Sequence, residues 1–322
     1  MAPPASGIRH GAHRAPRRST VPRSARGRLA CLAVASAVFS GLLVRPVLRW
    51  ADEPAEPVTV AASEQAVIVR PVPRALREGG EPPRPRAVDV GGVLAQLDGA
   101  AAQSRSWVGT VVVDEWGRTL LVNGDAERTV ATASLVKLLV VQQLLARSAD
   151  GTVVLDERAR RLMERAVTVS GDEAMSALWS RYDGEALLRD AVAAFGLTAT
   201  APPERPGQWG EATTTATDLA RFLSRMDTTP GAETLLGWMR SVAPTAADGF
   251  DQRFGLVAVA PGAAVKQGWM CCIGGRRQLH SVGVLADGRV VVVLGDAPSS
   301  TGWSALRRTL DGAAAALVAG TA

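Results

Sequence analysis

Apolar residues surround one stretch of the chain on every side. From Leu135 to Leu145 the sequence reads LVKLLVVQQLL, and its apolar positions leave no continuous polar face. Such a pattern is typical of a helix that is buried all round, because a surface helix keeps one polar side. We therefore expect the rest of a folded domain to pack around this segment.

Alternating and amphipathic patterns on both sides of this helix predict a mixed fold. Expected strands are 107–113, 119–122, 264–272, 279–285 and 289–294. Expected helices are 90–102, several short ones within 153–195, one after the capping box Thr215–Asp218, and 303–318, capped by Ser299–Thr301. The order predicts an α+β fold in which an antiparallel five-stranded sheet is flanked by terminal helices and interrupted by an inserted all-helical subdomain.

The first 87 residues have a different composition. Residues 1–28 are rich in Arg, Pro and Ala, which predicts a disordered basic tail on the cytoplasmic side. Residues 29–44 form an uncharged apolar run, and we expect the segment 29–50 to be a signal anchor or, as the alternative, a cleaved signal peptide. Residues 51–87 carry seven prolines and predict a linker, so that the folded domain would span 88–322. The expected location is the cell membrane with an extracytoplasmic domain, or the exterior if the segment is cleaved.

The positive charge of the chain belongs to this tail. Residues 1–50 contain nine Arg and no acidic residue, so subtracting them from the total of +5 leaves −4 for the rest. The basic pI therefore gives no reason to expect nucleic-acid binding, and a basic tail beside an apolar run is typical of a membrane-topology signal.

Three cysteines do not predict a disulfide framework. Cys31 lies at the start of the apolar run, a position that disfavours a lipobox cysteine. Cys271 and Cys272 are neighbours, and a ring closed between neighbours departs from ordinary disulfide geometry. We expect them to be strand residues packed on either face. No Cys or His cluster has metal-ligand spacing, and no metal or cofactor is expected.

Lysine usage points to the chemistry. The chain has 34 Arg and only two Lys, which are Lys137 and Lys266. An arginine cannot lose its proton in a protein, whereas a buried lysine can and then acts as a base. Lys137 follows Ser134 by three residues, which places hydroxyl and amine on one face of the buried helix.

Three motifs in order resemble those of one enzyme family. Ser134-Leu-Val-Lys137, Ser170-Gly-Asp172 and Lys266-Gln-Gly268 are similar to the S-x-x-K, S-D-N and K-T-G motifs of penicillin-recognising serine hydrolases. The resemblance covers about residues 88–320. It is strongest to the class A β-lactamase-like and penicillin-binding (D,D-peptidase) serine hydrolases, in the exported branch found in actinobacteria.

This resemblance implies roles for the matching residues. Ser134 would be the nucleophile that forms an acyl-enzyme, Lys137 its base, and Ser170 the group that returns a proton to the leaving nitrogen. Lys266 would hold the substrate carboxylate, and Gly268 would let substrate approach an edge strand. The N–H groups of Ser134 and Trp269 would form the oxyanion hole. The implied substrate is a β-lactam or the D-Ala-D-Ala stem of peptidoglycan, and the protein is expected to be a monomer.

The chain departs from the family pattern at two substrate-binding positions. Asp172 stands where the family has Asn, and a carboxylate cannot donate a hydrogen bond to a substrate carbonyl. Asp172 could instead pair with Lys137 and raise its pKa. Gln267 replaces a hydroxyl residue, although its amide can still donate to a carboxylate.

The loop from Leu197 to Thr213 also departs from the family pattern. Class A β-lactamases carry a glutamate here that activates the deacylating water, whereas Glu204 and Glu211 stand outside that frame. Slow deacylation is therefore expected. A catalytically degenerate cell-envelope protein that binds peptidoglycan with the same fold is the alternative. A Ser-His-Asp triad would need His280, the one histidine after residue 13, and it falls within an expected strand.

Overall fold

A single antiparallel sheet organises the described part of the chain. The computed structural model describes residues 88–322. Its main sheet contains β1 (Trp107–Val113), β2 (Thr119–Val122), β5 (Ala264–Cys271), β6 (Arg276–Val284) and β7 (Val290–Pro298). Their spatial order is β2-β1-β7-β6-β5, and every neighbouring pair is antiparallel. This arrangement confirms the expected five-stranded sheet and leaves β5 with one unpaired edge.

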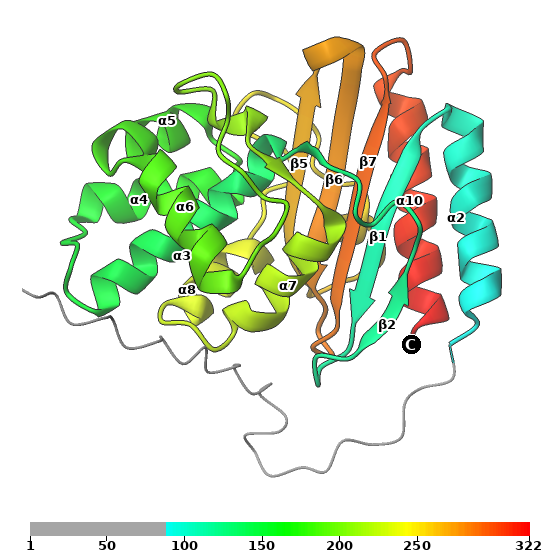
Figure 1. The fold of residues 1–322 in the computed structure, drawn as a ribbon, viewed down its shortest axis with the longest axis horizontal. Coiled ribbons are helices and arrows are strands. Elements are labelled where there is room, and N and C mark those ends of the chain that lie inside the picture. Colours follow the sequence, from blue (N-terminus) through cyan, green and yellow to red (C-terminus); the bar gives the residue numbers. More distant parts are fainter. Residues whose placement is uncertain (1–87) are drawn as a thin grey trace, which may run out of the picture. The chain divides into compact units, whose positions relative to one another are not determined.

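Helices cover both faces of this sheet (Figure 1). The terminal helices α2 (Val90–Ser104) and α10 (Trp303–Gly320) pack side by side on one face. The helical block lies on the other side of the sheet and is inserted between β2 and β5 in the sequence. It contains α3 (Val136–Ala149), α4 (Glu157–Thr168), α5 (Asp172–Arg181), α6 (Gly184–Phe195), α7 (Ala216–Met226) and α8 (Ala232–Arg240).

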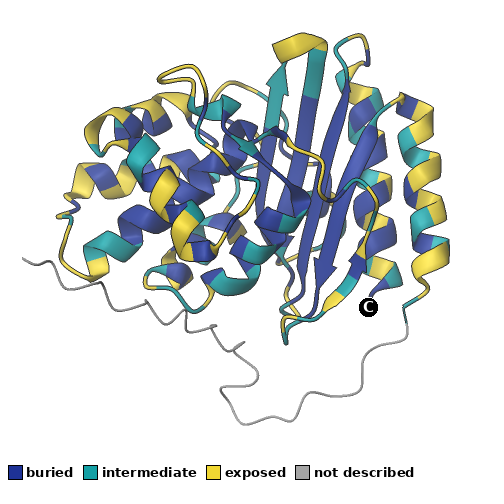
Figure 2. Cartoon of the chain, viewed as in Figure 1, coloured by how far each residue is buried: buried dark blue, intermediate teal, exposed yellow. Residues whose placement is uncertain are grey.

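Two hydrophobic cores result, one on each face of the sheet. Successive residues of a strand point to opposite faces, so Val111 and Val113 of β1 join the core under the helical block, and Val108 and Val112 join the core under α2 and α10. The central strands are consequently buried on both faces (Figure 2).

The predicted central helix is buried as expected. Every residue of α3 from Val136 to Leu145 is buried, and Lys137 lies among them. The side chain of Thr215 accepts a hydrogen bond from the backbone N–H of Asp218, which confirms Thr215 as the N-cap of α7. The Asp218 carboxylate does not close the capping box, because it accepts from the backbone N–H groups of Thr198 and Ala199. The cap of α10 was predicted wrongly, because its N-cap is Gly302 without a side-chain bond, while Thr301 donates its hydroxyl to the carbonyl of Ser104.

Short elements complete the fold around the site. A two-stranded sheet pairs β3 (Val130–Ala131) with β4 (Thr213–Thr214), and a short helix α9 (Leu256–Val259) precedes β5. Three 3-10 turns are η1 (Ala133–Leu135), η2 (Trp209–Glu211) and η3 (Ile273–Gly275).

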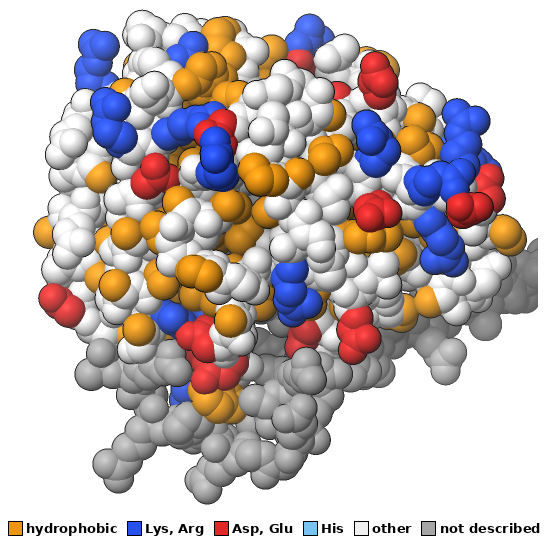
Figure 3. Space-filling view, turned by 180° about the vertical axis from the view of Figure 1, so that it is seen from behind, with side chains coloured by type: hydrophobic (Ala, Val, Ile, Leu, Met, Phe, Trp, Pro, Cys, Tyr) orange, Lys and Arg blue, Asp and Glu red, His pale blue; other side chains and the backbone are white. Residues whose placement is uncertain are grey.

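Basic and acidic side chains are interspersed on the face of the molecule seen in Figure 3. They lie among uncharged and apolar side chains. Arg181 pairs with Asp156 at 3.0 Å, and Arg253 pairs with Asp251 at 2.9 Å. Exposed pairs of this kind contribute little to stability, because water and salt screen their charges. Between residues 88 and 322, none of the helices is both long and apolar enough to cross a bilayer, and the expected anchor at 29–50 lies outside the described residues.

Candidate active site

A tight turn places Ser134 at the head of α3. Ser134 lies in the 3-10 turn η1, and α3 begins two residues later. The residue before it, Ala133, has a φ of 47°, in the left-handed region that residues with a Cβ atom rarely occupy. Strain of this kind persists where surrounding structure imposes it, often at functional sites. Here the backbone N–H of Thr132 donates to the carbonyl of Ala212 at 2.6 Å, which ties the turn to the loop 197–213.

The amine of Lys137 contacts the Ser134 hydroxyl. Lys137 Nζ lies 2.9 Å from Ser134 Oγ, 2.6 Å from the carbonyl oxygen of Ser170 and 2.7 Å from Asp172 Oδ1. Burial lowers the pKa of Lys137, and the carboxylate of Asp172 opposes that shift. The expected ion pair between Asp172 and Lys137 is therefore present. The Lys137 side chain is buried, whereas that of Asp172 is 69% exposed.

Ser170 joins the two lysines of the chain. Ser170 also has a left-handed backbone, with a φ of 52°, and it immediately precedes the turn into α5. Its hydroxyl lies 3.4 Å from Lys137 Nζ and 2.8 Å from Lys266 Nζ. Burial lowers the pKa of Lys266 well below its usual value, and the nearby charge of Lys137 adds to that effect. The four groups form one continuous chain of polar contacts from Ser134 to Lys266.

Gln267 of β5 does not face the site, contrary to the expectation from the sequence. The side-chain amide of Gln267 donates to the backbone carbonyls of Gln252, at 3.0 Å, and Phe254, at 2.5 Å. It therefore points into the core and does not offer its N–H groups to a substrate carboxylate. Period-two alternation explains this placement, because Lys266 on one side of Gln267 faces the site.

Gly268 serves the nucleophile turn. A Cβ atom at Gly268 would lie 3.2 Å from Leu135 Cγ and 3.3 Å from the carbonyl oxygen of Thr132. The missing side chain thus lets the turn that carries Ser134 pack directly on β5. We expected this glycine to make room for substrate, and the observed neighbours assign the space to the protein itself.

Trp269 is fixed by its own packing. Its ring stacks on Phe250 with centroids 4.6 Å apart, and its Nε1 donates to Asp248 Oδ2 at 3.0 Å. Trp269 lies in β5, whose outer edge has no strand partner among the described residues. Its rigid side chain holds this part of the edge in place beside the Ser134 turn.

A cavity of about 490 Å³ opens beside Ser134. Its lining comes from the turn that carries Ser134, from α5, from the end of β5 and from the loop 197–213. The residues lining it are Ala133, Ser134, Asp172, Ser176, Arg205, Gly207, Gln208, Trp209, Gly210, Glu211, Trp269, Met270, Cys271 and Ile273. Lys137, Ser170 and Lys266 lie behind this lining, so the cavity reaches the buried chain through Ser134 and Asp172.

The loop 197–213 closes over Lys137 with an aromatic ring. The Trp209 ring centroid is 4.8 Å from Lys137 Nζ, and Trp209 Nε1 donates to Ser176 Oγ at 3.2 Å. Glu211 reaches the cavity, but both of its carboxylate oxygens bind the guanidinium of Arg205. Glu204 is exposed and does not line the cavity.

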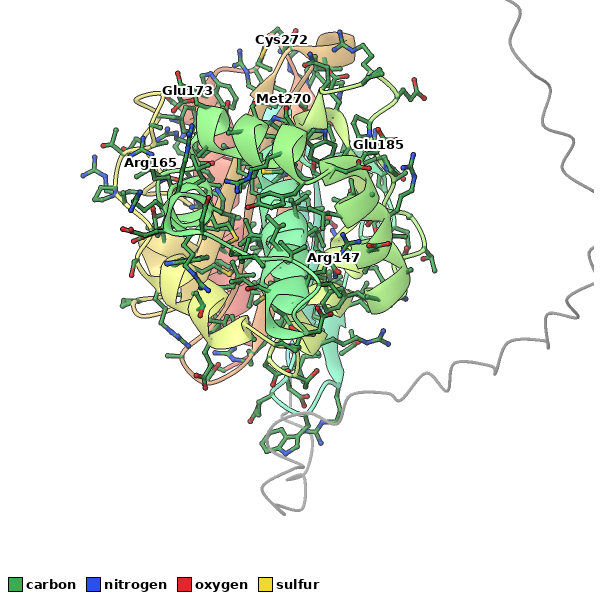
Figure 4. All side chains as sticks on the ribbon, turned by 90° about the vertical axis from the view of Figure 1, so that its left-hand side faces the viewer. Arg147, Arg165, Glu173, Glu185, Met270 and Cys272 are labelled. Carbon is green, nitrogen blue, oxygen red and sulfur yellow. A yellow bond between two sulfur atoms is a disulfide. The ribbon has the colours of Figure 1, made fainter. Side chains whose placement is uncertain are left out.

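The two neighbouring cysteines are joined, contrary to the sequence expectation. Cys271 and Cys272 form a disulfide at the end of β5, where that strand passes into η3. Cys271 lines the cavity, Cys272 is exposed, and Figure 4 shows Cys272 at the upper end of the molecule above Met270. We expected ordinary strand residues because a sequence does not show how the chain turns at this point.

Sequence motifs identified most of the buried site residues but not the loop side chains that lie over them. Ser134, Lys137, Ser170, Asp172 and Lys266 lie together as expected, and Gln267 does not join them. Trp209 and Arg205 were not predicted, because no local pattern shows which loop side chains fold back onto α3. Between residues 88 and 322, no three His, Cys, Asp or Glu side chains are arranged to hold a metal ion.

Comparison with known sequences gives mycobacterial relatives. No protein-family model matches the chain. Over 209 residues it is 32% identical to LppW of Mycobacterium tuberculosis H37Rv, a protein described as a candidate lipoprotein. LppW of Mycobacterium bovis matches to the same extent. The match covers 62% of this chain and spans 66% of the length of LppW, just under two thirds.

Comparison with solved structures is more extensive. A β-lactamase from Sphaerobacter thermophilus superposes with a TM-score of 0.57 at 16% identity, covering 73% of this chain and 98% of the other. A β-lactamase from Chitinophaga pinensis gives 0.60 at 13% identity, covering 72% and 100%. The protein PBP-A gives 0.57 at 18% identity, covering 72% and 96%. At these identities the likeness shows the fold.

Proposed function

Because this chain has the β-lactamase/transpeptidase-like fold, we propose that it is a serine hydrolase that forms an ester between Ser134 and a β-lactam or a D-Ala-D-Ala peptidoglycan stem. The observation that carries this proposal is the 2.9 Å contact between Ser134 Oγ and Lys137 Nζ, beside an open cavity. A variant of PBP-A is described as an acyl-enzyme complex with penicillin G, so the same fold supports this covalent chemistry in another protein.

Acylation begins with attack by the Ser134 oxygen on the substrate carbonyl carbon. A C–O bond forms, the carbonyl electrons move onto oxygen, and the Ser134 proton enters the chain of Lys137, Ser170 and Lys266. The N–H groups of Ser134 and Trp269 would stabilise the oxyanion. The C–N bond then breaks, and the Ser170 hydroxyl gives its proton to the leaving nitrogen.

Deacylation needs a base for water, and the loop 197–213 supplies a poor one. Arg205 occupies both oxygens of Glu211, so this carboxylate is already paired. The Trp209 ring lies over Lys137, with its centroid 4.8 Å from Nζ, and leaves no room for a water molecule between them. We therefore expect the Ser134 ester to hydrolyse slowly, and the protein to behave more as a penicillin-binding protein than as an efficient β-lactamase.

One observation favours the non-catalytic alternative, a cell-envelope protein that binds peptidoglycan. The Asp172 carboxylate is paired with Lys137 at 2.7 Å, which stabilises the protonated amine and weakens it as a base. In that case the cavity would bind a peptidoglycan peptide without reaction.

The experiment that separates these functions is acylation by a fluorescent penicillin, followed by mass spectrometry of the labelled peptide. We expect one adduct on Ser134 in the full chain and none in Ser134→Ala. Ser241→Ala, at the exposed end of α8, is the matched control and should label like the wild type. An unlabelled wild type, or labelling that persists in Ser134→Ala, would contradict the acyl-enzyme. Peptidoglycan-fragment binding that Ser134→Ala leaves unchanged would then favour the alternative.

We also propose that the domain acts outside the cytoplasm. The residues 29–50 are the expected export segment, and the relative LppW is described as a candidate lipoprotein. Both substrates named above are encountered in the cell envelope. Fractionation of cells that express the full chain should recover it in the membrane, or in the medium if the segment is cleaved.

A further inference from the structure

The chain of contacts from Ser134 to Lys266 contains two amines that compete for protons. We propose that Lys266, and not Lys137, is the final acceptor of the Ser134 proton, and that Asp172 causes this by keeping Lys137 protonated. This inference rests on the proposed acyl-enzyme and assigns its acid–base chemistry.

The surroundings of Lys137 are those of an ammonium group. An ammonium has three N–H donors and no lone pair. Lys137 Nζ has three close acceptors, which are Ser134 Oγ, the Ser170 carbonyl and Asp172 Oδ1, at 2.6 to 2.9 Å. One of these acceptors carries a negative charge, and the Trp209 ring face adds a further favourable contact with a cation. All three donors are therefore used.

The surroundings of Lys266 are those of a neutral amine. Lys266 is fully buried, and none of the ion pairs found within residues 88–322 includes it. It has two close partners, the Ser170 hydroxyl at 2.8 Å and the carbonyl of Gln267 at 2.7 Å. The Trp269 ring centroid is 5.9 Å from Lys266 Nζ, further than the Trp209 ring is from Lys137 Nζ. A neutral amine has two N–H donors and one lone pair, so it can donate to the carbonyl and accept from the hydroxyl. A buried charge without a counter-ion would be costly.

The other charged groups near these lysines agree with this assignment. Asp172 from α5 and Asp248 from the segment before α9 both favour the charged form of Lys137. At Lys266, burial and the Lys137 charge lower the pKa, and Asp172 opposes them more weakly. On β6, His280 is neutral at pH 7 because burial lowers its pKa to about 4.

The charges that reach the cavity from the loop 197–213 do not alter this balance. Arg205 and Glu211 form an ion pair with each other, so their charges compensate locally. Lys266 is therefore the amine that loses its proton first.

The proton transfers balance as follows. Ser170 gives its hydroxyl proton to the Lys266 amine and takes a proton from Lys137 across 3.4 Å. Lys137, now an amine, takes the Ser134 proton as Ser134 Oγ attacks the carbonyl carbon. The net change is one proton moved from Ser134 to Lys266. When the C–N bond breaks, Ser170 protonates the nitrogen and Lys266 returns its proton to Ser170.

The chain offers a direct test because it contains only two lysines. The full-length protein labelled with ¹³C-lysine should give two side-chain Cε signals, each of which reports whether its amine is protonated. At pH 7 we expect one ammonium and one amine. In Asp172→Asn, the signal of Lys137 should titrate at lower pH, which assigns it, while that of Lys266 changes less. Lys266 found as an ammonium at pH 7, or Lys137 found as an amine, would overturn the inference.

Acylation kinetics give a second, independent test. Lys266→Arg places a permanent positive charge where we infer a neutral amine, and its guanidinium cannot accept a proton. We expect it to lower the acylation rate by about 10²- to 10⁴-fold, the usual size of a general-base contribution. Thermal unfolding of the variant verifies that it folds. Acylation within tenfold of wild type would mean that no proton has to pass to Lys266, and the relay would be wrong.

The two proposals fail in different ways. The labelled lysines are observed without substrate, so they test the relay on their own. Wild-type protein that takes no penicillin adduct while Lys266 is an amine refutes the acyl-enzyme. Wild-type protein that is acylated while Lys266 is an ammonium refutes only the relay.

Discussion

His280 connects the sheet to the turn that carries Ser134, and its protonation should destabilise the fold. His280 lies in β6 opposite Gly268, and its Nε2 is 3.0 Å from the backbone carbonyl of Ala131, two residues before the turn η1. The ring is fully buried, so it must donate to that carbonyl as a neutral imidazole. Burial lowers its pKa from 6.5 to about 4.

The expected loss of folding stability follows from this pKa shift. The unfolded chain binds a proton at His280 below about pH 6.5, whereas the folded chain does so only below about pH 4. Stability is therefore greatest above pH 6.5 and falls as the pH is lowered toward 4. The whole shift is worth about 3 kcal/mol, and the part between pH 7 and pH 5 is about 2 kcal/mol.

The assay is urea unfolding of wild type and His280→Gln at pH 7, 6 and 5. Gln can still donate to the Ala131 carbonyl but does not titrate. Other titrating groups contribute to both proteins and cancel in the difference. We expect wild type to lose about 2 kcal/mol more than the variant on going from pH 7 to pH 5. Equal losses in the two proteins would refute the assignment of a buried, neutral His280.

Two further predictions concern the packing of the site. Gly268→Ala should destabilise the protein by about 1–3 kcal/mol and slow acylation, because the added methyl group meets the nucleophile turn. Gly237→Ala, in open space within α8, should be neutral or stabilising in the same unfolding and acylation assays, and equal effects at both sites would contradict this packing. Trp209→Ala should speed hydrolysis of the Ser134 ester by admitting water beside Lys137, followed as loss of the adduct by mass spectrometry. Trp116→Ala, in the distant β1–β2 hairpin, should not, and a slower loss in Trp209→Ala would show that the ring does not exclude water.

The sequence was sufficient for the framework of the fold because its hydrophobic periods are strong. The all-round apolar run predicted α3, and the alternating runs predicted each strand of the main sheet. The strand ends were less accurate: β6 begins at Arg276, before its expected start, and β7 continues to Pro298, beyond its expected end. Polar residues at these ends, such as Asp296, are held by cross-strand contacts that no local pattern encodes.

The candidate site was predictable where its residues stand at helical spacing or match a motif of the family that the chain resembles. Ser134 in η1 and Lys137 in α3 stand three residues apart where the turn passes into the helix, so their contact follows from helical spacing. The direction of Gln267 was wrong because the motif gives its position but not which face of β5 it occupies. Trp209 covers Lys137 from 72 positions further along the chain, and such a contact depends on the path of an irregular loop.

The disulfide at the end of β5 makes the rim of the cavity depend on where the chain folds. Disulfides form and persist in oxidising compartments, whereas the cytoplasm keeps thiols reduced. A molecule that folds before export would therefore carry two free thiols at positions 271 and 272, one of them lining the cavity that holds Ser134. If the domain is exported as proposed, its cavity wall is completed only after transport, and protein produced in a reducing cytoplasm has two free thiols there in place of the disulfide.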